Sequence, residues 1–350
     1  MTVRKMRVGI AGVGFGAVVH VPGFVSEGWE VPVIFSRSEE RAAKAARDLG
    51  VPEYVTDYRR MIERKDLDAI AVVTPVDSHH ELTMAALRAG KHVLCEKPFA
   101  VNAAEAREME QEAAKRNLVG MDAHEFRFAP QRAYIAELVG LGYLGQLRYA
   151  LVNLEVAISA RSQPQAPGRL GGGHGLIGSQ GSHFIDGLMA WFGGVRSVSA
   201  NTRTLMPGRP VEDMFSITLD FARGGTAVLT LISAATVAQG ARIVLHGTDG
   251  TLSVSQPGSN PLPEGKVYGG KPGETALKEL PIPAHYRPLV DDRDHRLLSF
   301  RLLVRKFEEG IKEGYSPAPN FADGVRVQEV LDAARESSTQ GSKTIALAQT

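Results

Sequence analysis

Residues 7–17, RVGIAGVGFGA, decide the fold of this chain. The apolar run Arg7–Ala11 leads directly into glycines that fit the pattern G-x-G-x-x-A from residue 12 onward. In such a loop the first glycine permits a tight turn, the second lets the backbone approach a pyrophosphate, and the small third residue lets the next helix close on the sheet. Because a predicted strand precedes the pattern and a predicted helix follows it, we expect a dinucleotide site here rather than a plain glycine turn. The loop residues expected at the cofactor are Gly12, Gly14, Phe15, Gly16 and Ala17.

Strands and helices alternate through the first 122 residues. Strands are predicted at Arg7–Ala11, Val31–Phe35, Asp68–Thr74, His92–Glu96 and Leu118–Ala123. Helices are predicted over 39–49, 79–89 and 103–116, with caps at Ser38, at Ser78 with Glu81, and at Asn102 with Glu105. This order predicts βαβ units and an α/β fold: an N-terminal Rossmann domain over 1–123 with a doubly wound parallel sheet.

The pattern changes after residue 123, and residues 124–350 are predicted to form a second, α+β domain for substrate binding and oligomerisation. Strands are predicted at Gln146–Ile158, Ser197–Thr204, Met214–Phe221, Thr226–Ser233 and Ala241–His246, and helices over 130–140, 295–313 and 324–338. Tight turns at Arg223–Gly225 and Thr248–Gly250 predict an antiparallel meander, that is, an open and mostly antiparallel sheet. Residues 256–288, rich in Pro and Gly, are expected to be a surface excursion.

The composition excludes several classes of protein. Among 350 residues, 40 Lys and Arg balance 39 Asp and Glu, which argues against a dedicated nucleic-acid-binding protein. The single cysteine, Cys95, excludes an intrachain disulfide and a Cys-rich zinc site, and its apolar neighbours predict a small buried side chain. No signal peptide and no run of 18 apolar residues is found, so we expect a cytoplasmic protein without a membrane partner.

The end of the second predicted strand favours NADP over NAD. NAD sites usually place an Asp or Glu there, but this chain has Ser36 and Arg37, with Arg41 one turn into the helix. The first carboxylate is Glu39, which is expected to face away. Guanidinium and hydroxyl groups suit a 2′-phosphate through charge-assisted hydrogen bonds. The alternative is that Arg37 is a solvated loop residue.

Three later blocks carry a family resemblance. Thr74 and Pro75 are followed by His79, and residues 89–98 read AGKHVLCEKP. Together with the glycine motif and the block GSQGSHFID at 178–186, they resemble the Gfo/Idh/MocA oxidoreductase family over nearly the whole chain. The resemblance implies a nicotinamide-dependent oxidoreductase in which the lysine of Glu-Lys-Pro lies beside nicotinamide and substrate.

Lys97 is therefore the implied catalytic residue, and the resemblance also implies a cis Lys97–Pro98 bond. The position of Lys97 in the sequence is consistent with this role, because a lysine at the carboxyl end of a buried strand is partly desolvated and can share a proton with a substrate hydroxyl. Glu96 is expected to hold Lys97 by hydrogen bonding, and a structural ion pair is the alternative. The further positions expected at the cofactor are Thr74, Pro75, His79, Glu96 and Pro98, with His79 supporting the loop rather than reacting.

His183 matches the family's histidine, which faces the nicotinamide and serves in proton transfer. On a helix, Ser179, His183 and Asp186 would share one face, and a structural histidine is the alternative. Many family members carry Asp where this chain has Ser179, which leaves Asp186 as a candidate to orient His183. His174, in a glycine-rich loop at 171–175 that is expected to close over a ligand, is a second candidate for proton transfer.

Arg127, after the fifth predicted strand, is expected either to bind a substrate hydroxyl or carboxylate or to form an inter-domain ion pair. The sequence thus predicts an oxidoreductase that moves a hydride between NADP, with NAD possible, and a carbinol or carbonyl carbon of a sugar, polyol or related cyclic alcohol. No metal is expected, and the resemblance implies a homodimer or homotetramer formed through the C-terminal sheet. Two other functions stay open: a non-catalytic dinucleotide-sensing regulator, and a redox-assisted sugar- or glycoside-modifying enzyme with a retained cofactor.

Overall fold

The computed structural model describes residues 4–157, 174–256 and 265–348. The chain forms two compact units: unit 1 comprises residues 1–128 and 291–325, and unit 2 comprises residues 129–290 and 326–350. The predicted domain boundary at 123/124 lies a few residues before residue 128, where the chain first passes from unit 1 to unit 2. The sequence prediction placed 291–325 in the second domain, whereas these residues pack in unit 1.

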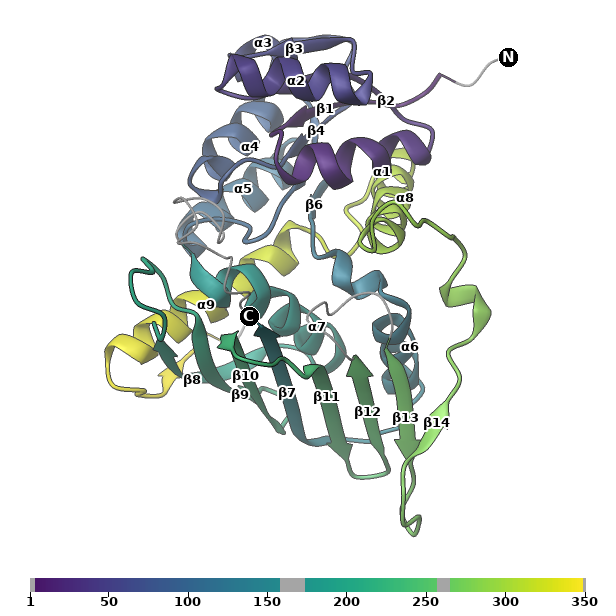
Figure 1. Ribbon diagram of the computed structural model, residues 1–350, viewed down its shortest axis with the longest axis vertical. Coiled ribbons are helices and arrows are strands. Elements are labelled where there is room, and N and C mark those ends of the chain that lie inside the picture. The colour runs from purple at the N-terminus through teal and green to yellow at the C-terminus, as the bar shows by residue number, and fades with distance from the viewer. Residues whose placement is uncertain (1–3, 158–173, 257–264, 349–350) are drawn as a thin grey trace. The chain divides into compact units, whose positions relative to one another are not determined.

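Unit 1 is built on a six-stranded parallel sheet with the order β3-β2-β1-β4-β5-β6 (Figure 1). Its strands are β1 (Arg7–Ala11), β2 (Glu30–Phe35), β3 (Glu53–Val55), β4 (Ala69–Val72), β5 (His92–Cys95) and β6 (Gly120–Asp122). The doubly wound parallel sheet is confirmed. The sequence prediction missed β3 and the helix α3 (Tyr58–Ile62), because a three-residue edge strand with exposed Glu53 and Tyr54 carries no apolar run.

Helices cover both faces of this sheet. On one face, Phe24 of α1 (Val21–Ser26) and Phe300 and Phe307 of α8 (Leu297–Glu313) pack with α2 (Glu39–Leu49) against Ile10. On the other face, α4 (His79–Arg88) and α5 (Ala103–Lys115) enclose a second apolar cluster. Helix α1 has only six residues, and α8 supplies much of the apolar surface on its face, which explains why residues 291–325 belong to unit 1.

The predicted helix caps can be checked individually. Ser38 accepts a hydrogen bond from the Arg41 N–H at 3.3 Å, and Asn102 accepts one from the Glu105 N–H at 3.0 Å, as expected. The capping box at Ser78 is wrong. Its hydroxyl instead donates 2.8 Å to the Pro75 carbonyl oxygen, because a 3-10 turn (η2, Val76–Ser78) precedes α4.

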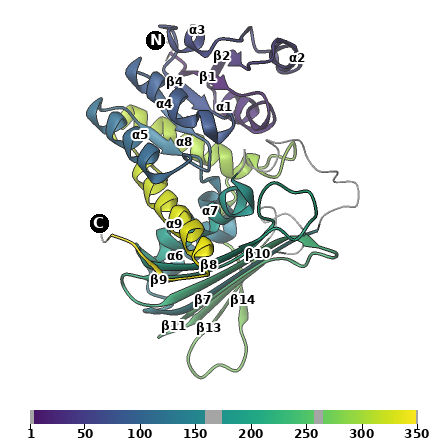
Figure 2. The same cartoon turned by 90° about the vertical axis from the view of Figure 1, so that its left-hand side faces the viewer.

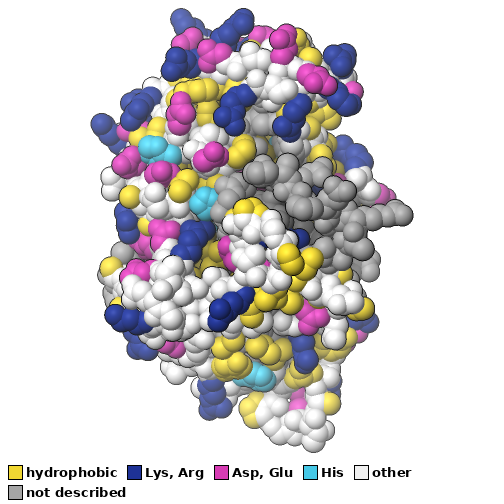
Figure 3. Space-filling model, turned by 60° about the vertical axis from the view of Figure 1, so that its left-hand side comes forward, with side chains coloured by type: hydrophobic (Ala, Val, Ile, Leu, Met, Phe, Trp, Pro, Cys, Tyr) yellow, Lys and Arg dark blue, Asp and Glu magenta, His cyan; other side chains and the backbone are white. Residues whose placement is uncertain are grey.

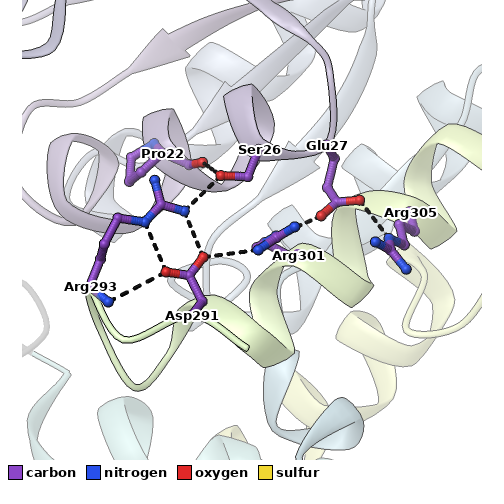
Figure 4. Close-up of polar contacts among 7 residues, drawn as sticks. All are labelled: Pro22, Ser26, Glu27, Asp291, Arg293, Arg301 and Arg305. Atoms are coloured by element: carbon purple, nitrogen blue, oxygen red, sulfur yellow. Dashed lines mark hydrogen bonds and ion pairs between the residues drawn. The ribbon is translucent and has the colours of Figure 1, made fainter. Parts of the chain in front are cut away.

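An ion-pair network fixes the returning segment to α1 (Figure 4). Arg301 of α8 donates 3.1 Å to Asp291 and 2.6 Å to Glu27, whose other oxygen accepts from Arg305 at 2.5 Å. The side chain of Arg293 forms two further bonds to Asp291, at 2.6 and 2.8 Å, and beside it the pKa of Asp291 falls to about 2. The carboxylates of Glu27 and Asp291 are almost fully buried, so Arg301 bridges two negative charges that are shielded from solvent.

Unit 2 contains a nine-stranded mixed sheet with the order β14-β13-β12-β11-β7-β10-β9-β8-β15. Its strands are β7 (Leu147–Ala157), β8 (Val195–Arg203), β9 (Met214–Phe221), β10 (Thr226–Ala235), β11 (Gly240–Gly247), β12 (Thr251–Gln256), β13 (Lys266–Gly270), β14 (Lys278–Leu280) and β15 (Ile345–Ala346). The mostly antiparallel character is confirmed, but the simple meander is wrong: β7 lies between β10 and β11 and is parallel to β10. The predicted surface excursion over 256–288 contains the strand β13 and the edge strand β14, and its residues 257–264 lie outside the described ones.

Three helices lie on one side of this sheet, as Figure 2 shows: α6 (Pro130–Gly140), α7 (Ser182–Phe192) and α9 (Phe321–Thr339). They cover the inward residues of β7, among them Val152 and Leu154, so the strand alternates as expected. On the face that Figure 3 shows, Lys and Arg mix with Asp and Glu over the upper part, and hydrophobic side chains gather in the lower part. Within the described ranges, no helix is long and apolar enough to cross a membrane.

Candidate functional site

The glycine loop of unit 1 has the geometry that a dinucleotide requires. Gly12 has φ +132°, and a Cβ there would collide with the carbonyl oxygen of Val73. At exposed Gly14 a Cβ would meet no protein atom within 4 Å, so the backbone stays open to a ligand. At Gly16 a Cβ would lie 3.0 Å from Ile10, so this residue lets the helical segment approach β1. The loop therefore fits the pyrophosphate of a dinucleotide.

The segment after the loop is a π-helical turn, η1 (Gly16–His20), which continues into α1. The sequence predicted only a helix here. The extra residue in the turn places His20 inside the protein, where its side chain is fully buried between Phe15 and Phe300. Ala17, the last residue of the motif, is half-buried in this turn.

Two arginines lie close after β2, and no carboxylate of the described residues pairs with them. Ser36 is buried and its hydroxyl accepts a 3.3 Å hydrogen bond from the Ser38 N–H. Arg37 and Arg41 are exposed, and within the part of the chain that the structure describes neither forms an ion pair. Glu39 is exposed in the first turn of α2. The geometry leaves two guanidinium groups available to an anion.

Lys97 follows β5 on a cis Lys97–Pro98 bond, as expected. Glu96, beside it, is buried and uses both carboxylate oxygens: Oε1 is 2.8 Å from Nε2 of His20, and Oε2 accepts the backbone N–H of Lys97 at 3.2 Å. Burial opposes ionisation of Glu96, but the hydrogen bond to His20 and the charges of His20 and Lys97 outweigh it and lower its pKa. Glu96 thus holds the backbone of Lys97 as an ionised group.

His79 connects the loop that follows β4 with the segment that follows β5. Its Nε2 lies 2.8 Å from the Thr74 carbonyl oxygen, and its Nδ1 lies 3.1 and 3.3 Å from the carbonyl oxygens of Pro98 and Phe99. Burial lowers the pKa of His79, while these carbonyls and Glu96 act in the opposite direction. With acceptors at both ring nitrogens, His79 ties the loop at Thr74 and Pro75 to the segment after Lys97.

Three functional candidates in unit 1 were not singled out from the sequence: His20, Glu125 and Arg296. Glu125, in the turn η3 (Glu125–Phe128), is buried; desolvation and the charge of Glu96 raise its pKa to about 7. Arg296 lies 4.8 Å from the ring of Phe15, and its guanidinium is held by Asp294 at 2.7 and 2.8 Å. A carboxyl group close after a buried strand was a usable signal for Glu125, but no local pattern marks the other two.

Arg127 forms an ion pair with Asp323 at 3.3 Å, and both side chains are largely buried. Both residues belong to unit 1, so this pair does not join two domains. The inter-domain interpretation of this contact is wrong because residues 291–325 return to unit 1. Cys95 is fully buried, as expected, and burial raises the pKa of its thiol, which makes a reactive thiolate unfavourable.

The histidine block lies in unit 2. His183 and Asp186 are buried on α7, whereas Ser179 is half-buried in a preceding π-helical turn, η4 (Ile177–Gly181). The predicted continuous α-helix over this block is therefore wrong, and the i, i+4 spacing does not apply to Ser179. The hydroxyl of Ser182 donates 2.8 Å to the Gly178 carbonyl oxygen and joins the two helical segments.

His174 stands at the start of the same region. Its Nδ1 lies 3.1 Å from Nη2 of Arg335, and because a guanidinium only donates, this nitrogen accepts and carries no proton. Glu212 accepts the backbone N–H of Ile177 at 3.1 Å, and a Cβ on Gly175 would collide with the Glu212 carboxylate. The loop residues 171–173, expected to close over a ligand, lie outside the described residues.

Known proteins match this chain over nearly its whole length. Residues 6–124 match the model of an oxidoreductase family with an NAD-binding Rossmann fold, and residues 136–347 match the C-terminal alpha/beta domain of the same family. The chain is 26% identical to levoglucosan dehydrogenase of Pseudarthrobacter phenanthrenivorans, covering 97% of each chain. It is 27% identical to scyllo-inositol 2-dehydrogenase (NADP+) of Bacillus subtilis, covering 97% of this chain and 95% of the relative. A solved levoglucosan dehydrogenase in complex with NADH and levoglucosan is similar in fold, with a TM-score of 0.86, 23% identity and coverage of 99% and 100%.

Proposed function

The chain belongs to the Gfo/Idh/MocA oxidoreductase family, and we propose that it transfers a hydride between NADP and a carbinol carbon of a sugar, polyol or related cyclic alcohol. It is a nicotinamide-dependent oxidoreductase that acts on CH–OH groups. The observation that carries the proposal is the position of Lys97. It directly follows Glu96 at the carboxyl end of β5, at the same edge of the parallel sheet as the glycine loop that follows β1. Ligands bind at this edge in open α/β sheets.

In the proposed reaction, the amine of Lys97 positions and polarises the reacting oxygen, and His183 takes or returns the hydroxyl proton. A bound nicotinamide supplies the hydride acceptor or donor. Glu96 and His20 fix the backbone that carries Lys97, and His79 fixes the loop opposite it. Asp186 and Ser179 are proposed to line the substrate site with Arg127, and His174 is the lesser candidate for proton transfer because Arg335 occupies its Nδ1.

The preference for NADP over NAD rests on the exposed guanidinium groups of Arg37 and Arg41, for which the described residues provide no carboxylate. A hydrogen bond to a charged group contributes about 1.5–3 kcal/mol, so we expect Arg37→Ala to reduce the NADP/NAD ratio of kcat/KM by roughly 10- to 100-fold. Arg47→Ala, an exposed arginine on the same helix, is the matched control. An unchanged ratio in Arg37→Ala would contradict the proposed phosphate contact.

The oxidoreductase function is tested by NADP- and NAD-dependent turnover on a panel of sugars, polyols and cyclic alcohols. Lys97→Met and His183→Asn are each expected to lower kcat by about 100-fold or more, while fluorescence titration shows that the dinucleotide still binds. A Lys97→Met enzyme that turns over within a few-fold of the wild type would refute the catalytic role. Dinucleotide binding without turnover on any alcohol would favour the sensing alternative, and a copurifying dinucleotide would favour the enzyme with a retained cofactor.

We also propose a homodimer or homotetramer through the outward face of the sheet in unit 2. Leu151 of β7 pairs with Val228 of β10 and with Val244 of β11, and the three side chains point away from the helices. With half-exposed Tyr149 they form an apolar row across the centre of the sheet. Light scattering tests this: Leu151→Glu is expected to yield monomers, and a wild type that is itself monomeric would contradict the proposal.

A further inference from the structure

A buried cluster of charged and titratable groups lies at the carboxyl edge of the sheet in unit 1. Cys95 of β5 pairs in register with Asp122 of β6, so the residues that follow each strand leave the sheet side by side. Lys97 follows the first strand and Glu125 the second. The groups that face the cluster come from five parts of the chain: His20 on η1, His79 on α4, Glu96 and Lys97 after β5, His124 and Glu125 after β6, and Arg296 before α8.

The two carboxyl groups of this cluster have different environments. Glu96 receives hydrogen bonds on both oxygens and is held ionised. Glu125 is 2% exposed; burial first, and then the negative charge of Glu96, raise its pKa to about 7, while Lys97 and His124 act against the rise. Arg296 also faces both glutamates, and Asp294 holds its guanidinium through two hydrogen bonds. Paired carboxyl groups whose environments push their pKa values apart are typical of acid–base chemistry.

We propose that Glu125 is a further acid–base residue of this enzyme, exchanging with the Lys97 amine the proton that the reacting oxygen loses or gains. This inference rests on the proposed hydride transfer. In the oxidation, the C–H bond breaks and its electron pair leaves as hydride to the nicotinamide. The Lys97 ammonium gives one proton to the Glu125 carboxylate, and the amine so formed takes the O–H proton of the substrate. In the reduction each transfer runs in reverse, and the step requires His183 as well, so the loss of either side chain lowers kcat.

The geometry explains why Glu125 suits this task. Its side chain is removed from water, so a proton held there is exchanged with the cluster rather than freely with solvent. Burial, and after it the fixed negative charge of Glu96, raises the pKa of Glu125 to about 7, so near neutral pH its carboxyl group can both accept and return a proton. His20 and the backbone of Lys97 hold Glu96, so that charge stays in place during the reaction.

The test is the pH dependence of kcat in Glu125→Gln, which keeps the shape of the side chain but cannot ionise. We expect kcat to fall by about 100-fold and the ionisation near neutral pH to disappear from the profile. His183→Asn is expected to retain that ionisation, and Glu125→Asp to retain it at a shifted pH. Glu63→Gln, an exposed carboxyl without a described contact, is the matched control and should behave as the wild type. A Glu125→Gln enzyme with kcat and pH profile within two-fold of the wild type would overturn the proposal.

A second readout does not depend on turnover or on the variant's activity. Infrared difference spectra across a pH titration of the wild type should show the carboxylic acid C=O stretch of a buried acid converting to carboxylate near pH 7, and Lys97→Met should move that conversion to higher pH. The signal should be absent in Glu125→Gln. If the wild type shows this infrared signal but oxidises no alcohol, the proposed function is refuted and the raised pKa of Glu125 is not. If the wild type turns over without this signal, only the role of Glu125 is refuted.

Discussion

Glu125→Gln is expected to make the protein more stable at alkaline pH while it makes the enzyme slower. In the folded protein Glu125 is buried with a pKa of about 7, whereas in the unfolded chain it ionises near the ordinary value of 4.5. Between these values the folded state binds a proton that the unfolded state has released. The stability due to this group is therefore complete below about pH 4.5 and is lost as the pH rises through about 7.

The size of the effect follows from the difference between the two pKa values. Each unit corresponds to 1.36 kcal/mol, so ionisation of buried Glu125 costs unit 1 about 3 kcal/mol once the pH exceeds 8. A glutamine resembles the protonated acid in shape but cannot ionise, so the variant does not lose this stability at high pH. The variant should match the wild type near pH 4.5 and exceed its free energy of unfolding by about 3 kcal/mol at pH 8.5, less any hydrogen bond that the amide cannot form.

The assay is urea unfolding at a series of pH values, followed by tryptophan fluorescence for Trp29, which is buried in unit 1. The difference between variant and wild type is the measured quantity, because the contributions of all other titrating groups largely cancel in it. Glu63→Gln provides the baseline, with no pH-dependent difference expected. A Glu125→Gln protein that is less stable than the wild type by the same amount at every pH would refute the raised pKa and, with it, the proton held at this site.

Three further outcomes are expected from the structure. Gly12→Ala should abolish dinucleotide binding in fluorescence titrations, because its Cβ would collide with the carbonyl of Val73 at φ +132°; retained affinity would show that the loop can rearrange. Arg301→Met should lower the free energy of unfolding by about 2 kcal/mol and Tm by about 4–8 °C, since it removes the bridge between two buried carboxylates. Arg305→Met, at a more exposed position, should lower the free energy of unfolding by less, and equal losses in the two variants would count against the bridge. Cys95 should resist iodoacetamide in the native protein at pH 8 and react fully in denaturant, and rapid native labelling seen by mass spectrometry would contradict its burial.

Local features of the sequence determined a large part of unit 1. The glycine pattern that starts at Gly12, the caps at Ser38 and Asn102 and the alternation along β7 each depend on residues within about ten positions of one another. Such features act through backbone conformation, hydrogen bonding and burial of one face, and they operate in the same way wherever the segment lies in the fold. For this reason the parallel sheet and the position of Lys97 at its carboxyl edge could be predicted before any coordinates.

Only the tertiary structure decided which distant segments meet. His20 and Glu96 are 76 residues apart and form a buried pair because a π-helical turn directs the histidine inward, which no helical periodicity indicates. The return of α8 to unit 1 and the insertion of β7 between β10 and β11 likewise depend on which apolar faces remain to be covered once the other elements have formed. Pairing at such separations is chosen by the burial and electrostatics of the complete fold, because no local preference of either segment distinguishes one partner from another.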